Sequence, residues 1–251
     1  MSDSALTQRL AHAGLDWIVP QWPAPSSVHA LSTTRNAGIG RSIDLAPASP
    51  AIDPARESLR RFIPAEPLWL AQQHGTRVVD ADEMHAQSPR ADAAVARTTG
   101  KVCAILSGDC LPVLFATRDG SVVAAAHAGW RGLAAGVLEA TVVSMRIAPD
   151  QVVAWMGPSI GASAFEVGDE VRAAFCDLDG EAATAFFAGK PGKWFADLHA
   201  LARRRLARAG VVEVSGVARC TFTESASFYS YRRGGADAAG RMATLIWRDQ
   251  T

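Results

Sequence analysis

The sequence has no long hydrophobic run, no net charge and few cysteines. None of its apolar stretches approaches the ~18–20 residues that a membrane-spanning helix needs. Its 25 Lys and Arg residues balance 25 Asp and Glu residues, so the formal net charge is zero. This balance removes the usual electrostatic basis for binding nucleic acids or membranes. We therefore expect neither as a partner.

The cysteine content argues against a disulfide framework. Four cysteines are spread over 251 residues, and the first 14 residues, MSDSALTQRLAHAG, are too polar for an export signal. A chain of this kind is expected to keep its thiols reduced in the cytoplasm. We expect Cys103 in a strand core and Cys176 at a helix end, while Cys220 packs inside the fold or lies near the site.

Apolar residues make up 49% of the chain, without repeats or low-complexity linkers. We therefore expect one compact domain over residues 1–251. Short apolar runs bounded by Gly, Asp and Pro predict buried strands. These strands are expected at residues 101–107, 112–117, 121–129, 151–157, 211–216 and 241–248.

Helical spacing of apolar residues predicts the other elements. The helices are expected at residues 55–63, 132–147, 166–175 and 195–210, the last with Asp197 at its start and Gly210 at its end. The expected strands are too unevenly separated along the chain for a regular βαβ repeat. This spacing indicates a mixed α/β (α+β) fold, with a mixed β-sheet flanked by helices.

Three metal-capable side chains stand at the ends of elements, each among small residues: His74, Cys110 and His127. Nitrogen and sulfur ligands suit Zn²⁺, and three protein ligands leave the fourth position open, as in catalytic sites. The spacings of 36 and 17 residues lack the short pairing of a structural zinc site. From spacing alone, ordinary core or loop positions remain the alternative. Gly75 permits close backbone approach, and Pro112 is expected to make Cys110 the last residue of its strand.

The remaining histidines lack this framing by small residues. We expect them at surface or boundary positions; they are His12, His29, His85 and His199.

Several sequence blocks occur together in the order of a known family. They include STTRNAGIG, QQHGTRVV, ADAAV, SGDCLPVLFA, AAHAGWRGLAAGVL, CTFTESASFYSYRR and GRMATLIW. From about Thr33 to Trp247, the chain resembles the YfiH-like proteins, long labelled laccase-domain or multicopper polyphenol oxidoreductases. The resemblance implies a zinc-dependent purine nucleoside phosphorylase acting on adenosine, inosine, guanosine or methylthioadenosine with phosphate. It also implies adenosine deaminase activity.

The same resemblance implies that His74, Cys110 and His127 bind the metal. Zinc is the expected ion, and copper is an alternative or adventitious one. The chain departs from the usual family pattern at Gln73, at Gly108 and in the stretch SIDLAPAS around Asp44.

Phosphorolysis requires an anion site, which arginine suits because its guanidinium donates paired hydrogen bonds to phosphate. Arg35, with Gly38 and Gly40 beside it, is the leading candidate, and a surface ion pair is its alternative. Arg131 is a second catalytic candidate, or a structural residue at a helix start. Arg232 is a candidate for covering the sugar or phosphate.

Purine binding requires surfaces for stacking and hydrogen bonding. Phe228 and Tyr229 are candidates for stacking on the base, or else core residues of an alternating strand. Gln72 is a further candidate for contacting the substrate. For deamination, Asp109 is the expected acid/base, unless its side chain points away from the metal and only supports it. Glu166 is a weaker alternative.

Two other functions are associated with the family. Some members are called peptidoglycan editing factors, and a metal hydroxide would equally serve hydrolysis of mis-made muramyl precursors. A copper polyphenol oxidase is the older reading, but the chain's six histidines are too few for the several copper centres of that class. The sequence does not indicate the oligomeric state.

Overall fold

A hairpin of two buried strands, β5 (Leu111–Thr117) and β6 (Val123–Ala128), lies at the centre of the molecule. The computed structural model describes residues 3–37, 54–235 and 240–249. Every residue of both strands is buried. Along β5, Phe115 faces one core and Leu114 the other, as the alternation of a strand requires. The sheet is therefore covered on both faces.

The hairpin belongs to a mixed six-stranded sheet. Its strand order is β11 (Glu213–Gly216), β7 (Val152–Met156), β5, β6, β3 (Ala93–Ala96) and β2 (Val78–Asp80). The outer pairs β11–β7 and β2–β3 are parallel, and the inner pairs are antiparallel.

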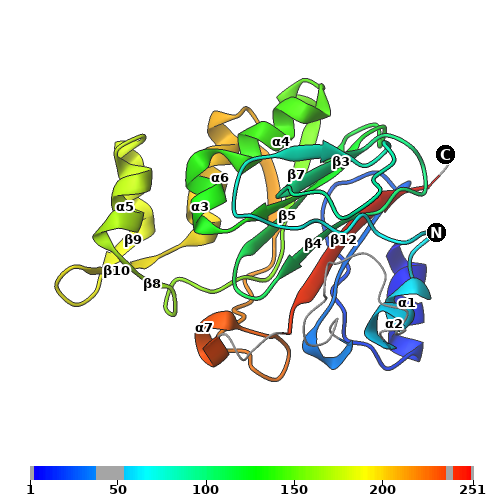
Figure 1. Cartoon of the computed structure of the whole chain (residues 1–251), viewed down its shortest axis with the longest axis horizontal. Helices are drawn as coiled ribbons and strands as arrows, with labels where there is room; N and C mark the ends of the chain where they lie inside the picture. The colour runs from blue at the N-terminus through cyan, green and yellow to red at the C-terminus, as the bar shows by residue number, and fades with distance from the viewer. Residues whose placement is uncertain (1–2, 38–53, 236–239, 250–251) are drawn as a thin grey trace.

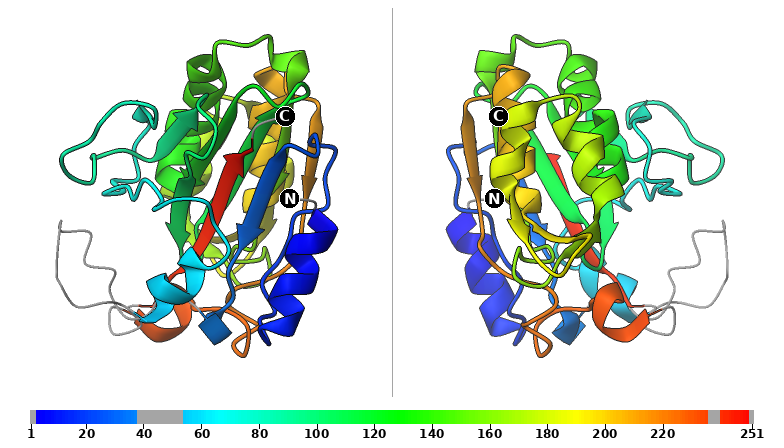
Figure 2. Two further views of the ribbon diagram at one scale, coloured as in Figure 1. Left: turned by 90° about the vertical axis from the view of Figure 1, so that its right-hand side faces the viewer. Right: turned by 90° about the vertical axis from the view of Figure 1, so that its left-hand side faces the viewer.

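A second, antiparallel sheet packs on one face of the first. It consists of β1 (Val28–Ser32), β12 (Met242–Arg248) and β4 (Cys103–Ser107). Leu114 and Trp155 of the large sheet share a core with Ile105 and Ile246 of the small one. Helices α1 (Asp3–His12) and α2 (Pro54–Arg60) cover its outer face (Figures 1 and 2).

The other face of the large sheet is covered by α3 (Trp130–Ala135), α4 (Val137–Met145) and α6 (Leu198–Arg208). The prediction of one helix over residues 132–147 was wrong. Gly136 adopts φ 102°, a conformation that a helix interior does not accommodate, and it ends α3 where α4 begins. Asp197 caps α6 as predicted, accepting a hydrogen bond from the backbone of Ala200.

A small third sheet projects at the left of Figure 1 beside α5 (Asp169–Cys176). Its strand order is β8 (Glu166–Gly168), β10 (Lys193–Ala196) and β9 (Phe186–Ala188). The prediction of a helix over residues 166–175 was wrong at its start, because residues 166–168 pair with β10 before the helix begins. The predicted mixed α/β fold is confirmed, although the strands of the described residues form three sheets rather than one.

The remaining elements are short. They are the 3-10 turns η1 (Arg35–Ala37), η2 (Pro149–Gln151) and η3 (Gly180–Ala185), and the helix α7 (Tyr231–Gly234). None of the helices in the described ranges is long and apolar enough to cross a membrane.

Candidate metal centre

The three predicted ligands converge at one end of the central strands β5 and β6 of the large sheet. His74 lies in the loop before β2, Cys110 links β4 to β5, and His127 is near the end of β6. Their ligating atoms all lie within 4.8 Å of one another. His74 Nε2 is 3.8 Å from Cys110 Sγ, and the two imidazole rings meet edge-on with centroids 4.8 Å apart. Residues from three separate chain segments thus form one group of donors.

The placement of Cys110 differs from the prediction. Cys110 does not end a strand, because β4 stops at Ser107 and Pro112 is the second residue of β5. The three-residue link 108–110 carries the chain from the small sheet to the large one. Because Cys110 lies outside both strands, strand pairing does not fix its orientation, and its thiol can face the two histidines.

The donor set and its spacing fit a zinc-like ion. Zn–N and Zn–S bonds at tetrahedral angles place nitrogen and sulfur ligands about 3.5 Å apart, close to the observed separation. Gly129 leaves the space among the ligands open. A Cβ at this position would lie 2.9 Å from Cys110 Sγ and 2.9 Å from His74 Cδ2. Two histidines and one cysteine can therefore hold a metal ion here and leave a fourth position for another ligand.

A carboxylate that the sequence analysis missed lies directly behind these ligands. Asp92, buried just before β3, has Oδ1 2.9 Å from His127 Nδ1. It also accepts hydrogen bonds from the backbone N–H groups of Gln73, His74 and Gly75. The available signal was a charged residue at the start of an apolar strand, in the block ADAAV.

The ligands strongly influence one another's ionisation. Burial raises the pKa of the Cys110 thiol, but the charges and hydrogen bonds of His127 and His74 outweigh it and lower that pKa to about 6. Burial lowers the pKa of His127, whereas Cys110 and Asp92 raise it above its ordinary value. For Asp92, the hydrogen bonds from His127, Gly75 and Gln73 outweigh burial and lower the pKa. Cys110 is therefore a thiolate near neutral pH, the form that binds metals.

The Asp109 carboxylate is bound by the C-terminal segment. Its carboxylate accepts hydrogen bonds from Thr221 Oγ1 at 2.6 Å, Ser230 Oγ at 3.0 Å and the Arg232 backbone at 2.7 Å. Asp109 adopts φ 116° in the link rather than lying in a strand, so the alternation argument does not apply to it. The geometry favours the supporting alternative, in which Asp109 fastens the C-terminal segment beside Cys110.

Two of the predicted purine-binding residues, Gln72 and Phe228, make their contacts inside the fold. The Gln72 amide donates to the Leu106 carbonyl and accepts from the Leu106 N–H, tying its loop to β4. Phe228 is fully buried, so it packs as a core side chain and leaves no face for a base. Tyr229 is only partly buried, and the Arg35 guanidinium lies 5.4 Å from its ring centroid.

The three arginines predicted at the site are exposed, and each contacts a different part of the fold. Arg35 Nη1 donates to the Ser225 carbonyl, and Arg232 Nη1 donates to the carbonyl of Glu166, the weaker acid/base candidate. Arg131 lies over the Trp130 ring at the start of α3. Gly38, Gly40 and Asp44, singled out from the sequence, lie outside the described residues.

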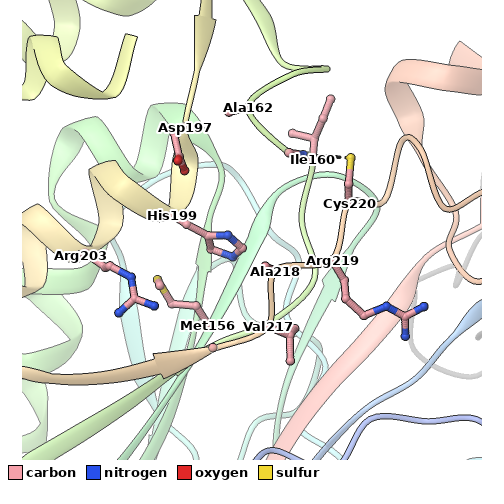
Figure 3. Close-up of a pocket in the computed structure, with 12 residues that line it drawn as sticks. Met156, Ile160, Ala162, Asp197, His199, Arg203, Val217, Ala218, Arg219 and Cys220 are labelled. Atoms are coloured by element: carbon pink, nitrogen blue, oxygen red, sulfur yellow. Dashed lines mark hydrogen bonds between the residues drawn. The ribbon is translucent and has the colours of Figure 1, made fainter. Parts of the chain in front are cut away.

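A separate cleft of about 370 Å³ opens at the ends of β7 and β11 (Figure 3). Cys220 lies beside Ile160 on one wall, and His199 lies on the α6 wall. His199 Nε2 donates to the Gly157 carbonyl at 3.1 Å, and the Gly161 N–H donates to Cys220 Sγ at 3.1 Å. This cleft does not include the three converging ligands.

One prediction for the remaining histidines was wrong. His29 is fully buried rather than at a boundary, because β1 is covered by Trp247 and by the N-terminal helix. Its Nε2 lies 3.0 Å from a carboxylate oxygen of Asp249. His12 is exposed, and His85 and His199 are partly buried.

Comparison with known proteins agrees with this geometry. The family model described as multi-copper polyphenol oxidoreductase laccase matches residues 31–249. A protein of Pseudomonas aeruginosa named purine nucleoside phosphorylase is 46% identical, over 92% of this chain and 98% of that protein. The purine nucleoside phosphorylase YfiH of Escherichia coli is 47% identical, with the same coverage of both chains.

Solved structures agree at the level of the fold. A crystal structure of a Neisseria meningitidis protein matches with a TM-score of 0.87 and 45% identity, over 94% of this chain and 100% of that one. YlmD of Geobacillus stearothermophilus matches with a TM-score of 0.80 and 25% identity, over 94% and 99%. By sequence and by fold, the chain therefore belongs to the multi-copper polyphenol oxidoreductase laccase family, together with the YfiH-type proteins.

Proposed function

We propose that this chain is a cytoplasmic, zinc-dependent purine nucleoside phosphorylase. The observation that carries the proposal is the convergence of His74, Cys110 and His127 within 4.8 Å. Relatives at 46% and 47% identity are named for this activity, which supports its extension to this chain. Two nitrogens and a thiolate suit Zn²⁺. Copper is the competing ion, because it binds nitrogen and sulfur donors tightly.

Phosphorolysis joins a phosphate oxygen to C1′ of the sugar and breaks the N-glycosidic bond, and the departing purine takes up a proton. A metal ion held by His74, Cys110 and His127 would supply positive charge and Lewis acidity at this point. The arginines supply the anion site. Arg35 is the leading phosphate ligand, since its guanidinium is exposed and its charge suits phosphate oxygens. Arg131 and Arg232 are the further cations.

Tyr229 is the best-placed aromatic for the base among the predicted residues, because it is partly exposed while Phe228 is buried. Asp109 holds the segment that carries Tyr229 and Arg232 through its bonds to Thr221, Ser230 and the Arg232 backbone. We assign Asp109 this positioning role in both phosphorolysis and a secondary deamination of adenosine.

Product analysis tests the proposal. Zinc-loaded protein is incubated with adenosine, with and without phosphate, and the products are separated by chromatography. Adenine and ribose 1-phosphate that appear only with phosphate demonstrate phosphorolysis, whereas inosine reports deamination. Failure of the zinc-loaded protein to convert adenosine, inosine, guanosine or methylthioadenosine would contradict the proposal. Elemental analysis of protein purified without added metal distinguishes zinc from copper.

A further inference from the structure

One buried carboxylate touches two of the three ligand-bearing segments. We propose that Asp92 is a positioning residue of the metal centre: it fixes Nε2 of His127 as the ligating atom and holds the His74 loop against it. The inference rests on the proposed binding of a metal, but not on which reaction the protein catalyses. It concerns residues that act through the ligands rather than on the substrate.

The contact between Asp92 and His127 determines which imidazole nitrogen is free. Asp92 is 1% exposed, and its Oδ1 lies 2.9 Å from His127 Nδ1. An ionised carboxylate only accepts hydrogen bonds, so Nδ1 carries the proton in this contact. Nε2 is the remaining nitrogen, and once it has no proton its lone pair is available to the metal. A carboxylate behind a ligating histidine generally fixes the tautomer and the ring orientation in this way.

The same carboxylate also organises the backbone of the His74 loop. Three consecutive N–H groups, those of Gln73, His74 and Gly75, donate to it at 3.1, 2.8 and 2.8 Å. His74 adopts φ 58°, a left-handed conformation that residues other than glycine rarely occupy. The three bonds to Asp92 compensate for this conformation and direct the His74 side chain towards Cys110.

Asp92 is itself fixed relative to β6. Its backbone carbonyl accepts a hydrogen bond from the His127 N–H at 2.7 Å, and Ala93 pairs with Ala126 in the sheet. The carboxylate therefore ties the irregular His74 loop to a rigid strand. A change at Asp92 alters the orientation of both histidines together.

The substitution Asp92→Asn tests this role because it keeps the size of the side chain while removing its charge. The amide has one acceptor oxygen where the carboxylate has two, so it cannot accept from His127 Nδ1 and from the Gly75 N–H group together, and one of the two ligand-bearing segments loses its support. We expect zinc affinity, measured by competition with a chelating dye, to fall about 10- to 100-fold. Asp92→Glu, which retains the charge, is expected to recover part of this loss.

Asp82→Asn is the control. Asp82 is also an aspartate that accepts backbone hydrogen bonds, from Arg97 and Thr98, and neither bond comes from a ligand-bearing segment. We expect a loss of thermal stability with a change in zinc affinity of less than about threefold, because no hydrogen bond to a ligating residue or its loop is removed. Wild-type zinc affinity in a folded Asp92→Asn protein, or equal losses in both variants, would overturn the inference.

A measurement on the unaltered protein covers the case in which Asp92→Asn does not fold. Imidazole ¹⁵N spectra of the zinc-loaded protein are expected to show His127 protonated at Nδ1 and bound to zinc through Nε2. The opposite assignment would overturn the proposed role of Asp92. If the wild-type protein does not bind zinc at all, the metal dependence of the proposed function fails first, so the two failures are distinguishable.

Discussion

The candidate metal centre and the cleft of Figure 3 both contain a histidine and a cysteine, yet their arrangement differs. At the metal centre, His127 and Cys110 direct their ligating atoms to one point together with His74. In the cleft, His199 and Cys220 lie on different walls, and each is engaged by backbone groups, those of Gly157 and Gly161. Convergence and a supporting carboxylate, rather than the size of the hollow, distinguish the candidate site.

The pKa values of His127 and His199 shift in opposite directions. Burial lowers the pKa of His199, and the hydrogen bond to Gly157 and the charge of Asp197 only partly oppose it. At His127 burial also acts to lower the pKa, but Cys110 and Asp92 reverse the direction. The candidate metal centre therefore favours coupled charges, whereas burial disfavours the charged form of the histidine of the cleft.

The largest expected effect comes from paired histidine substitutions. His127→Ala removes a ligand, and we expect kcat/KM for adenosine phosphorolysis to fall on the order of 1,000-fold or more. His199→Ala in the cleft is expected to change it less than about threefold, because it removes no metal ligand. Steady-state kinetics on the two purified proteins checks this contrast. Equal losses would show that the cleft belongs to the active site.

Paired cysteine substitutions test whether the Cys110 thiolate is a metal ligand. Cys110→Ser replaces a thiolate with a hydroxyl, a poor ligand for zinc, so the purified protein is expected to contain much less than one zinc per chain. Cys220→Ser is expected to retain the wild-type content, measured by elemental analysis. A full complement of zinc in the Cys110→Ser protein would contradict the assignment of this ligand.

Zinc retention is expected to depend on pH. Because the folded-state pKa of Cys110 is lowered to about 6, the thiolate is present above that pH and is lost as the pH falls through it. Protons then compete with the metal. Zinc affinity, measured by competition with a chelating dye between about pH 5 and pH 8, should decrease as the pH falls towards and below about 6. An affinity independent of pH over this range would argue against a thiolate ligand.

The smallest expected difference in zinc affinity is between two glycine substitutions, one at each region. In Gly129→Ala the new methyl lies 2.9 Å from Cys110 Sγ and from His74 Cδ2, so zinc affinity is expected to fall about 10-fold because the ligand geometry is distorted. In Gly161→Ala the methyl lies 3.2 Å from Cys220 Sγ in the cleft, and zinc affinity is expected to be unchanged. Chelator competition measures both. Similar losses would remove the distinction between the regions.

Local sequence patterns predicted much of the fold. Apolar runs located β4, β5, β6, β7, β11 and β12, since strand burial leaves a direct mark on composition. They did not reveal that β1, β12 and β4 form a sheet of their own, because that pairing joins segments that are distant in the sequence. The break at Gly136 was missed because the apolar spacing runs through it: Leu133 and Thr141 are both buried although they lie on separate helices.

The site was predictable to a different degree. The ligand trio follows from its motifs, whereas the spacing alone left a core reading open. Asp92 was not identified because its role depends on the β3–β6 register, which brings it beside His127. Gln72 was expected at the substrate and Phe228 either at the base or in the core, and only the three-dimensional contacts place them against β4 and in the core.

We claim that the His74–Cys110–His127 group holds the metal on which phosphorolysis depends. The most direct measurement compares ribose 1-phosphate formation from adenosine and phosphate by zinc-loaded protein, by chelator-stripped protein and by stripped protein resupplied with zinc. We predict product from the first and the third, and a near-complete loss of product in the second. Equal formation by folded, stripped protein, or no formation by any of the three, would contradict the claim.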